Sequence, residues 1–127
     1  MVPTAARAIE QIRTDFPDLP ISIREDDEGG AYVILEAVPL GPPYMHAATW
    51  MGFRIVHQYP YADTYPHYVR GDLARLDGRP LGDGMSPTSW EGRPAVQLSR
   101  RSNRLDAATD TAALKLKKVL AWLLSRP

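Results

Sequence analysis

The chain of 127 residues contains no cysteine. This absence excludes disulfide bonds, thiolate metal sites and thiol nucleophiles, because each of them requires a cysteine sulfur. An excess of charge is also lacking: 15 basic residues balance 15 acidic ones, so the net charge favours neither nucleic acid nor a membrane as a partner. No apolar run approaches the roughly 20 residues that a bilayer requires, and the N-terminus does not resemble a signal peptide. We therefore expect a cytoplasmic protein, without a cofactor.

The composition is that of an ordinary globular protein. Hydrophobic residues make up 44% of the chain and charged residues 24%, which is close to the average for folded domains. A chain of this length suits one domain. Because it shows neither an internal repeat nor a linker, we expect a single domain spanning residues 1–127.

Apolar residues recur at helical spacing near both ends of the chain. The first such segment, residues 3–16, ends at Pro17. In the second, residues 110–124, Leu116, Leu120 and Leu123 share one face and are expected to be buried.

The polar residues of the second segment give two further predictions. Lys115 and Lys118 are expected to lie off the leucine face. Thr109 or Asp110 is the expected N-cap, since both side chains can accept a hydrogen bond from a free backbone amide.

Strand-like segments, rich in alternating or β-branched residues, fill much of the chain between these helices. They cover residues 21–25, 31–38, 48–57 and 94–98, and the glycine-containing sequence DDEGG turns the chain between the first two. Residues 70–91 are rich in glycine, proline and charge, so we expect a long ordered loop in which only LARL favours a short strand or helical turn. The order predicts an α+β fold: an antiparallel meander of three or four strands, with an N-terminal and a C-terminal helix on one face.

The middle of the chain carries proline motifs in a distinctive order. LEAVPLGPP is followed by the strand-like TWMGFRIV and then by YPYADTYP. This order resembles the central meander of ubiquitin-conjugating enzymes, in which one strand ends at Gly-Pro-Pro, the next runs into Phe-Pro or Tyr-Pro, and a further Tyr-Pro follows. Gly41-Pro42-Pro43, Pro60 and Tyr65-Pro66 occupy those places. The resemblance implies a UBC-like or RWD-like fold, although turn chemistry alone also favours such residues at a strand exit.

The second half departs from that family. Ser86-Pro87-Thr88 stands where the family has His-Pro-Asn, and Gln97 stands near the position of its catalytic cysteine. The family's thiolate accepts the carboxyl terminus of a ubiquitin-like protein as a thioester, whereas a glutamine amide is not a nucleophile. The segment WEGRPAVQLSRRSN and the final helix are similar to the divergent prokaryotic ubiquitin-conjugating-like family E. That resemblance implies an operon encoding a ubiquitin-like protein, an activating-enzyme-like protein and a JAB-type metalloprotease.

Serine and arginine residues follow the degenerate segment. The Ser99 hydroxyl would form an oxyester if a base activated it, but a serine that ends a strand is the simpler interpretation. Arg100, Arg101 and Arg104 suit bidentate binding of a carboxylate or phosphate. A solvated basic loop has the same composition.

Four tyrosines, Tyr59, Tyr61, Tyr65 and Tyr68, occupy the proline-rich stretch. If exposed they would form a recognition surface, since tyrosine is enriched at interfaces; if folded under, they form the core of the loop. Trp50, Trp90 and Trp122 are expected to be buried or half-buried anchors.

The three histidines are His46, His57 and His67. Together with Asp63 they offer metal-ligating atoms, but their spacing matches no compact metal motif, so we expect no metal site.

Three functions remain open at this point. The first is a non-catalytic ubiquitin-conjugating-like domain that binds a ubiquitin-like protein or an activating-enzyme-like protein. The second is a divergent carrier enzyme that forms an oxyester through a serine. The third is an RWD-like interaction module unrelated to conjugation.

Overall fold

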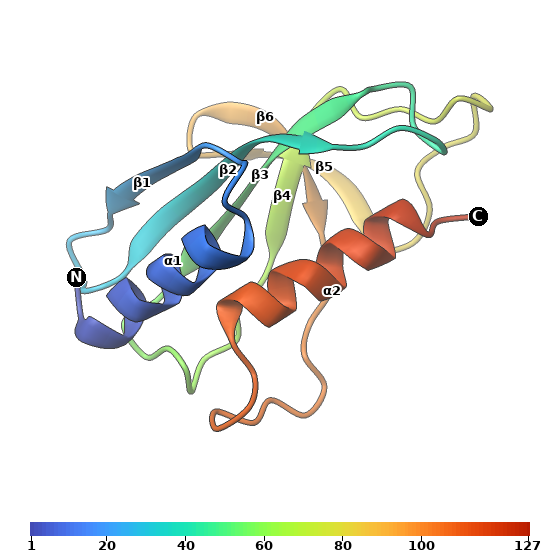
Figure 1. Ribbon diagram of the computed structural model, residues 1–127. Helices are drawn as coiled ribbons and strands as arrows, with labels where there is room; N and C mark the ends of the chain where they lie inside the picture. The colour runs from blue at the N-terminus through green and yellow to red at the C-terminus, as the bar shows by residue number, and fades with distance from the viewer.

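A computed structural model describes residues 1–127 and shows one antiparallel sheet with both helices on the same face (Figure 1). The sheet has six strands in the order β1-β2-β3-β4-β6-β5. In chain order the elements are α1 (Pro3–Asp15), β1 (Ile21–Glu25), β2 (Ala31–Pro39), β3 (Ala48–Ile55), β4 (His67–Arg70), β5 (Met85–Trp90), β6 (Arg93–Leu98) and α2 (Ala112–Leu124). The predicted α+β class, the antiparallel pairing and the two terminal helices are confirmed.

The strand count of three or four was too low. The predicted segments correspond to β1, β2, β3 and β6, whereas β4 and β5 were not predicted. β6 pairs with β4 on one side and with β5 on the other. β5 lies inside the segment that we predicted to be a long loop. Four of its residues, 86–89, are exposed, so the strand has no pattern of buried positions to mark it. The LARL segment contributes only an isolated bridge between Arg75 and Tyr44.

The β5–β6 hairpin folds back over the face of the sheet that the helices leave open. Glu91 and Gly92 close it with positive φ angles of 48° and 77°. Beside this turn, Trp90 lies against Gly52 of β3, and Glu91 forms an ion pair with Arg24 of β1. The tip of the last hairpin therefore reaches the first strand of the sheet.

The hydrophobic core lies between the helices and the sheet. It is one cluster of 21 buried residues, to which α1 contributes Ile9 and Ile12 and α2 contributes Leu116 and Leu123. The prediction that Leu116 and Leu123 are buried is confirmed, whereas Leu120 is only half-buried at the edge of the cluster.

The last helix begins slightly later than its sequence indicated. Its N-cap is Thr111, whose hydroxyl accepts a hydrogen bond of 3.1 Å from the Leu114 amide. The expectation of Thr109 or Asp110 was therefore wrong. Asp110 instead accepts a hydrogen bond from the Asp106 amide, within the loop before the helix. Both helices have 13 residues, and neither is long and apolar enough to cross a membrane.

Candidate functional site

The proline-rich loop between β3 and β4 packs against the start of α2. It carries both Tyr-Pro peptide bonds, and each is cis. The Tyr59 hydroxyl accepts a hydrogen bond of 3.0 Å from the Ala112 amide, in the first turn of α2. Tyr61, two residues further on, is 81% exposed. One tyrosine therefore fixes the loop to the helix while another projects from it.

The four tyrosines do not form one cluster. The ring of Tyr65 lies 4.6 Å beneath the guanidinium of Arg101. Tyr68 lies on the opposite face of the sheet, where it stacks on Trp90 with 4.9 Å between ring centroids. Both alternatives from the sequence are therefore represented: Tyr61 is exposed, whereas Tyr59 is packed against the core.

Asp63 is the point at which three separate segments meet. Its carboxylate accepts hydrogen bonds from the Ser102 amide at 2.7 Å and from the Ser102 hydroxyl at 3.0 Å. It also accepts from the Lys115 ammonium at 3.1 and 3.3 Å. The same ammonium donates to the Ser102 hydroxyl at 2.8 Å. The proline-rich loop, the segment after β6 and α2 are thus joined by one polar network.

Lys115 was expected to lie off the leucine face, and the structure shows that it is nevertheless buried, with only 8% of the residue exposed. Its carbon chain lies over the core and its ammonium reaches Asp63, so that burial is compensated by a charged partner. Burial alone would raise the pKa of Asp63, but the hydrogen bonds from Ser102 and Lys115 lower that pKa below its ordinary value. The carboxylate therefore stays ionised at neutral pH.

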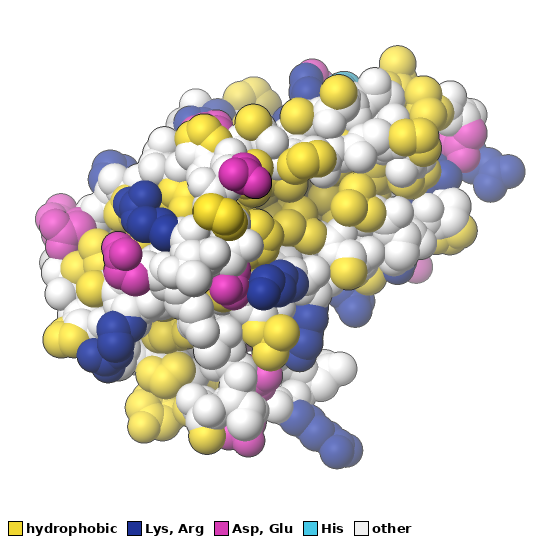
Figure 2. All heavy atoms as spheres, viewed as in Figure 1, with side chains coloured by type: hydrophobic (Ala, Val, Ile, Leu, Met, Phe, Trp, Pro, Cys, Tyr) yellow, Lys and Arg dark blue, Asp and Glu magenta, His cyan; other side chains and the backbone are white.

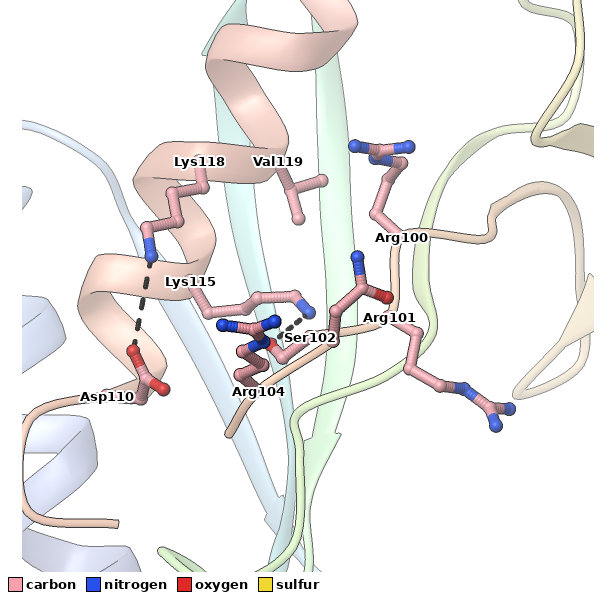
Figure 3. A pocket seen from close by; sticks show the side chains of 9 residues that line it. Arg100, Arg101, Ser102, Arg104, Asp110, Lys115, Lys118 and Val119 are labelled. Atoms are coloured by element: carbon pink, nitrogen blue, oxygen red, sulfur yellow. Dashed lines mark hydrogen bonds and ion pairs between the residues drawn. The ribbon is translucent and has the colours of Figure 1, made fainter. Parts of the chain in front are cut away.

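A cationic pocket of about 210 Å³ opens beside this network (Figure 3). Its charged walls come from the 100–104 segment and from the start of α2, namely Arg100, Arg101, Arg104, Lys115, Lys118 and Asp110. In the space-filling view, basic side chains gather around α2 and the loop that precedes it (Figure 2). The three arginines that suit bidentate binding thus line one site with two lysines of the last helix.

Two of these arginines are held by aromatic rings. The guanidinium of Arg100 lies 5.0 Å from the ring of Trp122, and that of Arg101 lies over Tyr65. In Figure 3 their side chains diverge from the pocket centre. None of the three arginines forms an ion pair with a carboxylate, in contrast to Lys118, which lies 4.0 Å from Asp110.

The residues at the degenerate active-site positions are neighbours in the β5–β6 hairpin. Ser86 lies directly opposite Gln97, while Pro87 and Thr88 continue along the exposed edge strand. The Gln97 amide donates a hydrogen bond of 3.2 Å to the Ser99 hydroxyl. These residues form a hairpin surface without a nucleophile of the thiol type.

Ser99 lacks an activating base. Its hydroxyl has the Gln97 amide as its hydrogen-bond partner, and its own amide donates to the Gly84 carbonyl at 2.8 Å. An amide donor cannot remove the hydroxyl proton, so the arrangement matches a serine that ends a strand.

The three histidines lie apart, and no group of three or more metal-ligating side chains is present. His46 contacts the Asp72 carbonyl at 3.0 Å, and His57 is exposed. His67 is completely buried beside Phe53, with 5.0 Å between the rings, and neither of its nitrogens has a hydrogen-bond partner. Burial, and to a smaller degree Lys115, lowers the pKa of His67 to about 3, against the opposing effect of Asp63.

Lys115, Lys118 and Ser102 were not recognised as site residues from the sequence. For Lys115 a signal was present: it lies three residues after Ala112 and four before Val119, both of which are buried. That spacing places it beside the apolar face. Ser102 carries no comparable signal, because its partner is 39 residues away.

The tryptophans behave as the anchors that the sequence predicts. Trp90 is 9% exposed and stacks between Tyr68 and Trp50. Trp50 and Trp122 are half-buried, each with a guanidinium over its ring.

The fold and the site together define an α+β protein with a cationic pocket at the junction of two loops and the last helix. No family model matches the chain, and no curated protein or solved structure shows significant similarity to it.

Proposed function

We propose that the chain is a non-catalytic ubiquitin-conjugating-like domain that binds a ubiquitin-like protein or an activating-enzyme-like protein. The observation that carries this proposal is the junction at Asp63. It joins the proline-rich loop to the segment after β6, so that two candidate binding segments form one continuous surface. We call it the tyrosine–arginine surface and define it by Tyr61, Tyr65, Arg100, Arg101 and Arg104.

The chemistry of the hairpin supports binding rather than catalysis. The chain has no cysteine. The Ser99 hydroxyl forms a hydrogen bond with the Gln97 amide and has no base as a partner. A thioester therefore cannot form, and the serine alternative lacks the activation that an oxyester would require.

The composition and anchoring of the surface favour a protein partner. Tyrosine and arginine are enriched among the residues that contribute most to protein–protein binding. Here Tyr61 is largely exposed, while Arg101 is held over Tyr65. Side chains that are already ordered lose less conformational entropy when a partner binds.

The proposal is tested by titrating the chain with the ubiquitin-like and activating-enzyme-like proteins of its own operon, by calorimetry and gel filtration. We expect a non-covalent complex that Tyr61→Ala and Arg101→Gln each weaken. Arg13→Gln is the matched control, because Arg13 is an exposed arginine of α1. Equal binding by all three variants, or no complex with either protein, would contradict the proposal.

Denaturing mass spectrometry after incubation with both proteins and ATP tests the catalytic alternative. We expect the unmodified mass. An adduct that resists thiols, yields to hydroxylamine and disappears in Ser99→Ala would show that the serine is a carrier and that the domain is catalytic.

A further inference from the structure

We infer that the cationic pocket between the 100–104 segment and α2 binds a phosphate group, either as a free phosphate compound or on a phosphorylated side chain. The inference goes beyond the proposed function, because it requires only this chain and no particular protein partner. Its basis is a concentration of uncompensated positive charge around one cavity of about 210 Å³.

The charges of the pocket are only partly balanced. Lys115 is paired with Asp63, and Lys118 lies 4.0 Å from Asp110. Arg100, Arg101 and Arg104 have no carboxylate partner, so that three positive charges remain without a counter-charge. Positive charges around one pocket repel one another, and a bound anion would reduce that repulsion.

The walls of the pocket are ordered in advance. The Asp63 network fixes Ser102, and therefore the course of the 100–104 segment, relative to α2. Trp122 supports Arg100 and Tyr65 supports Arg101 through cation–π contacts that leave the guanidinium edges free to donate hydrogen bonds. A fully solvated basic loop would have neither the anchor nor the aromatic supports.

The number of donors favours phosphate over carboxylate. A carboxylate brings one negative charge, whereas a phosphate monoester brings about 1.5 to 2 at neutral pH and three strong acceptor oxygens. Arg104 and the Lys118 ammonium supply donors for such a ligand, and the positive charges of Arg100 and Arg101, which diverge from the pocket centre, add to its attraction. Arg104 comes from the segment after β6 and Lys118 from α2, so a phosphate bound between these two segments would be contacted from both.

The test is a titration of the isotope-labelled chain, followed by NMR and calorimetry at constant ionic strength. The probes are pyrophosphate, a phosphoserine peptide, its unphosphorylated parent and the same peptide with glutamate at the modified position. We expect saturable binding of pyrophosphate or the phosphopeptide, with shifts at residues 100–104 and 118. Arg104→Gln and Lys118→Gln should each weaken binding about tenfold, the effect of one lost charge-assisted hydrogen bond.

Arg13→Gln is again the matched control and should bind as the parent does. Whichever phosphate ligand binds more tightly identifies the source of the phosphate. The inference is overturned if neither phosphate ligand saturates the chain, if the glutamate peptide binds as tightly, or if the control loses as much affinity as the pocket variants. Failure here would leave the protein partner of the proposed function untouched, since that is measured in a separate complex.

Discussion

The indole of Trp90 lies against the bare Cα of Gly52, so close that a methyl group added at residue 52 would stand 2.2 Å from the ring. Trp90 is thereby seated between Tyr68 and Trp50, and the β5–β6 hairpin is held across the open face of the sheet. Glycine is required here because Trp90 leaves no space for a side chain, and not for its backbone conformation, since its φ angle is not in the positive region.

Gly52→Ala should therefore displace Trp90 and destabilise the fold by about 1–3 kcal/mol, the usual cost of overpacking. The tryptophan emission should shift to the red as the indole becomes more exposed. Gly82→Ala is the control, since nothing lies within 4 Å of an added methyl group there. Identical urea midpoints for the two variants would show that the hairpin does not depend on this contact.

Stability should depend on pH through His67. In the unfolded chain its pKa is near the ordinary value of 6.5, and in the folded chain burial lowers the pKa to about 3. Between these values the unfolded chain binds a proton that the folded chain does not. The contribution to stability is therefore complete above pH 6.5 and decreases on acidification, by about 1.4 kcal/mol per pH unit.

His67→Met keeps a side chain of similar size without a titrating nitrogen. Urea unfolding between pH 5 and 7 should show a shallower pH dependence for this variant, and at pH 5 it should be the more stable protein. The range from pH 5 to 7 lies above the ordinary pKa values of carboxylates, so Asp63 and the other carboxylates contribute little to the pH dependence measured there. Parallel curves for parent and variant would mean that His67 is protonated in the folded chain.

Removing the charge of Asp63 should leave the Lys115 ammonium buried without its partner. We expect Asp63→Asn to cost about 1–3 kcal/mol of stability, as for a buried polar group that loses its hydrogen bonds. Lys115→Met combined with Asp63→Asn should cost less than the two single changes added together. Asp15→Asn breaks the exposed pair with Lys117 and should have almost no effect. Strict additivity of the Asp63 and Lys115 changes would show that they do not interact.

Leu116 and Leu120 of α2 should differ in their contribution to the stability of the fold. Leu116 is fully buried, whereas Leu120 is at the edge of the core. Leu116→Ala should cost about 2–5 kcal/mol, as for other buried leucines, and Leu120→Ala clearly less. Denaturant unfolding of both variants measures the difference, and a larger loss for Leu120→Ala would mean that the helix is rotated from the position described.

Periodicity in the sequence predicted the elements that bury one face. α1, α2 and strands β1 to β3 carry apolar residues at regular spacing, and all five were located from it. β4 and β5 were missed: β4 has only four residues, and residues 86–89 of β5 are all exposed on an edge strand. Alternating apolar residues mark a strand only when one of its faces is buried, so a strand with both faces exposed shows no such pattern.

The site was predicted in its residue types but not in its geometry. Arg100 and Arg101 were recognised as possible anion ligands, yet nothing local indicated that α2 would supply the facing wall. Lys115 was assigned to a position off the leucine face because a lysine usually lies on the polar face of a helix. The residue that overrides this preference is Asp63, which is 52 positions earlier in the chain.

The spacing of that network also sets when the surface can exist during synthesis. The hydrogen bonds of Asp63 cannot form until Ser102 and Lys115 have been synthesised, 39 and 52 residues later. Until α2 has been synthesised, Asp63 in the proline-rich loop lacks the Lys115 ammonium as a partner, and the Tyr59 hydroxyl lacks the helix amide that donates to it. A chain shortened before α2 therefore lacks the contacts that fix the proline-rich loop to the helix.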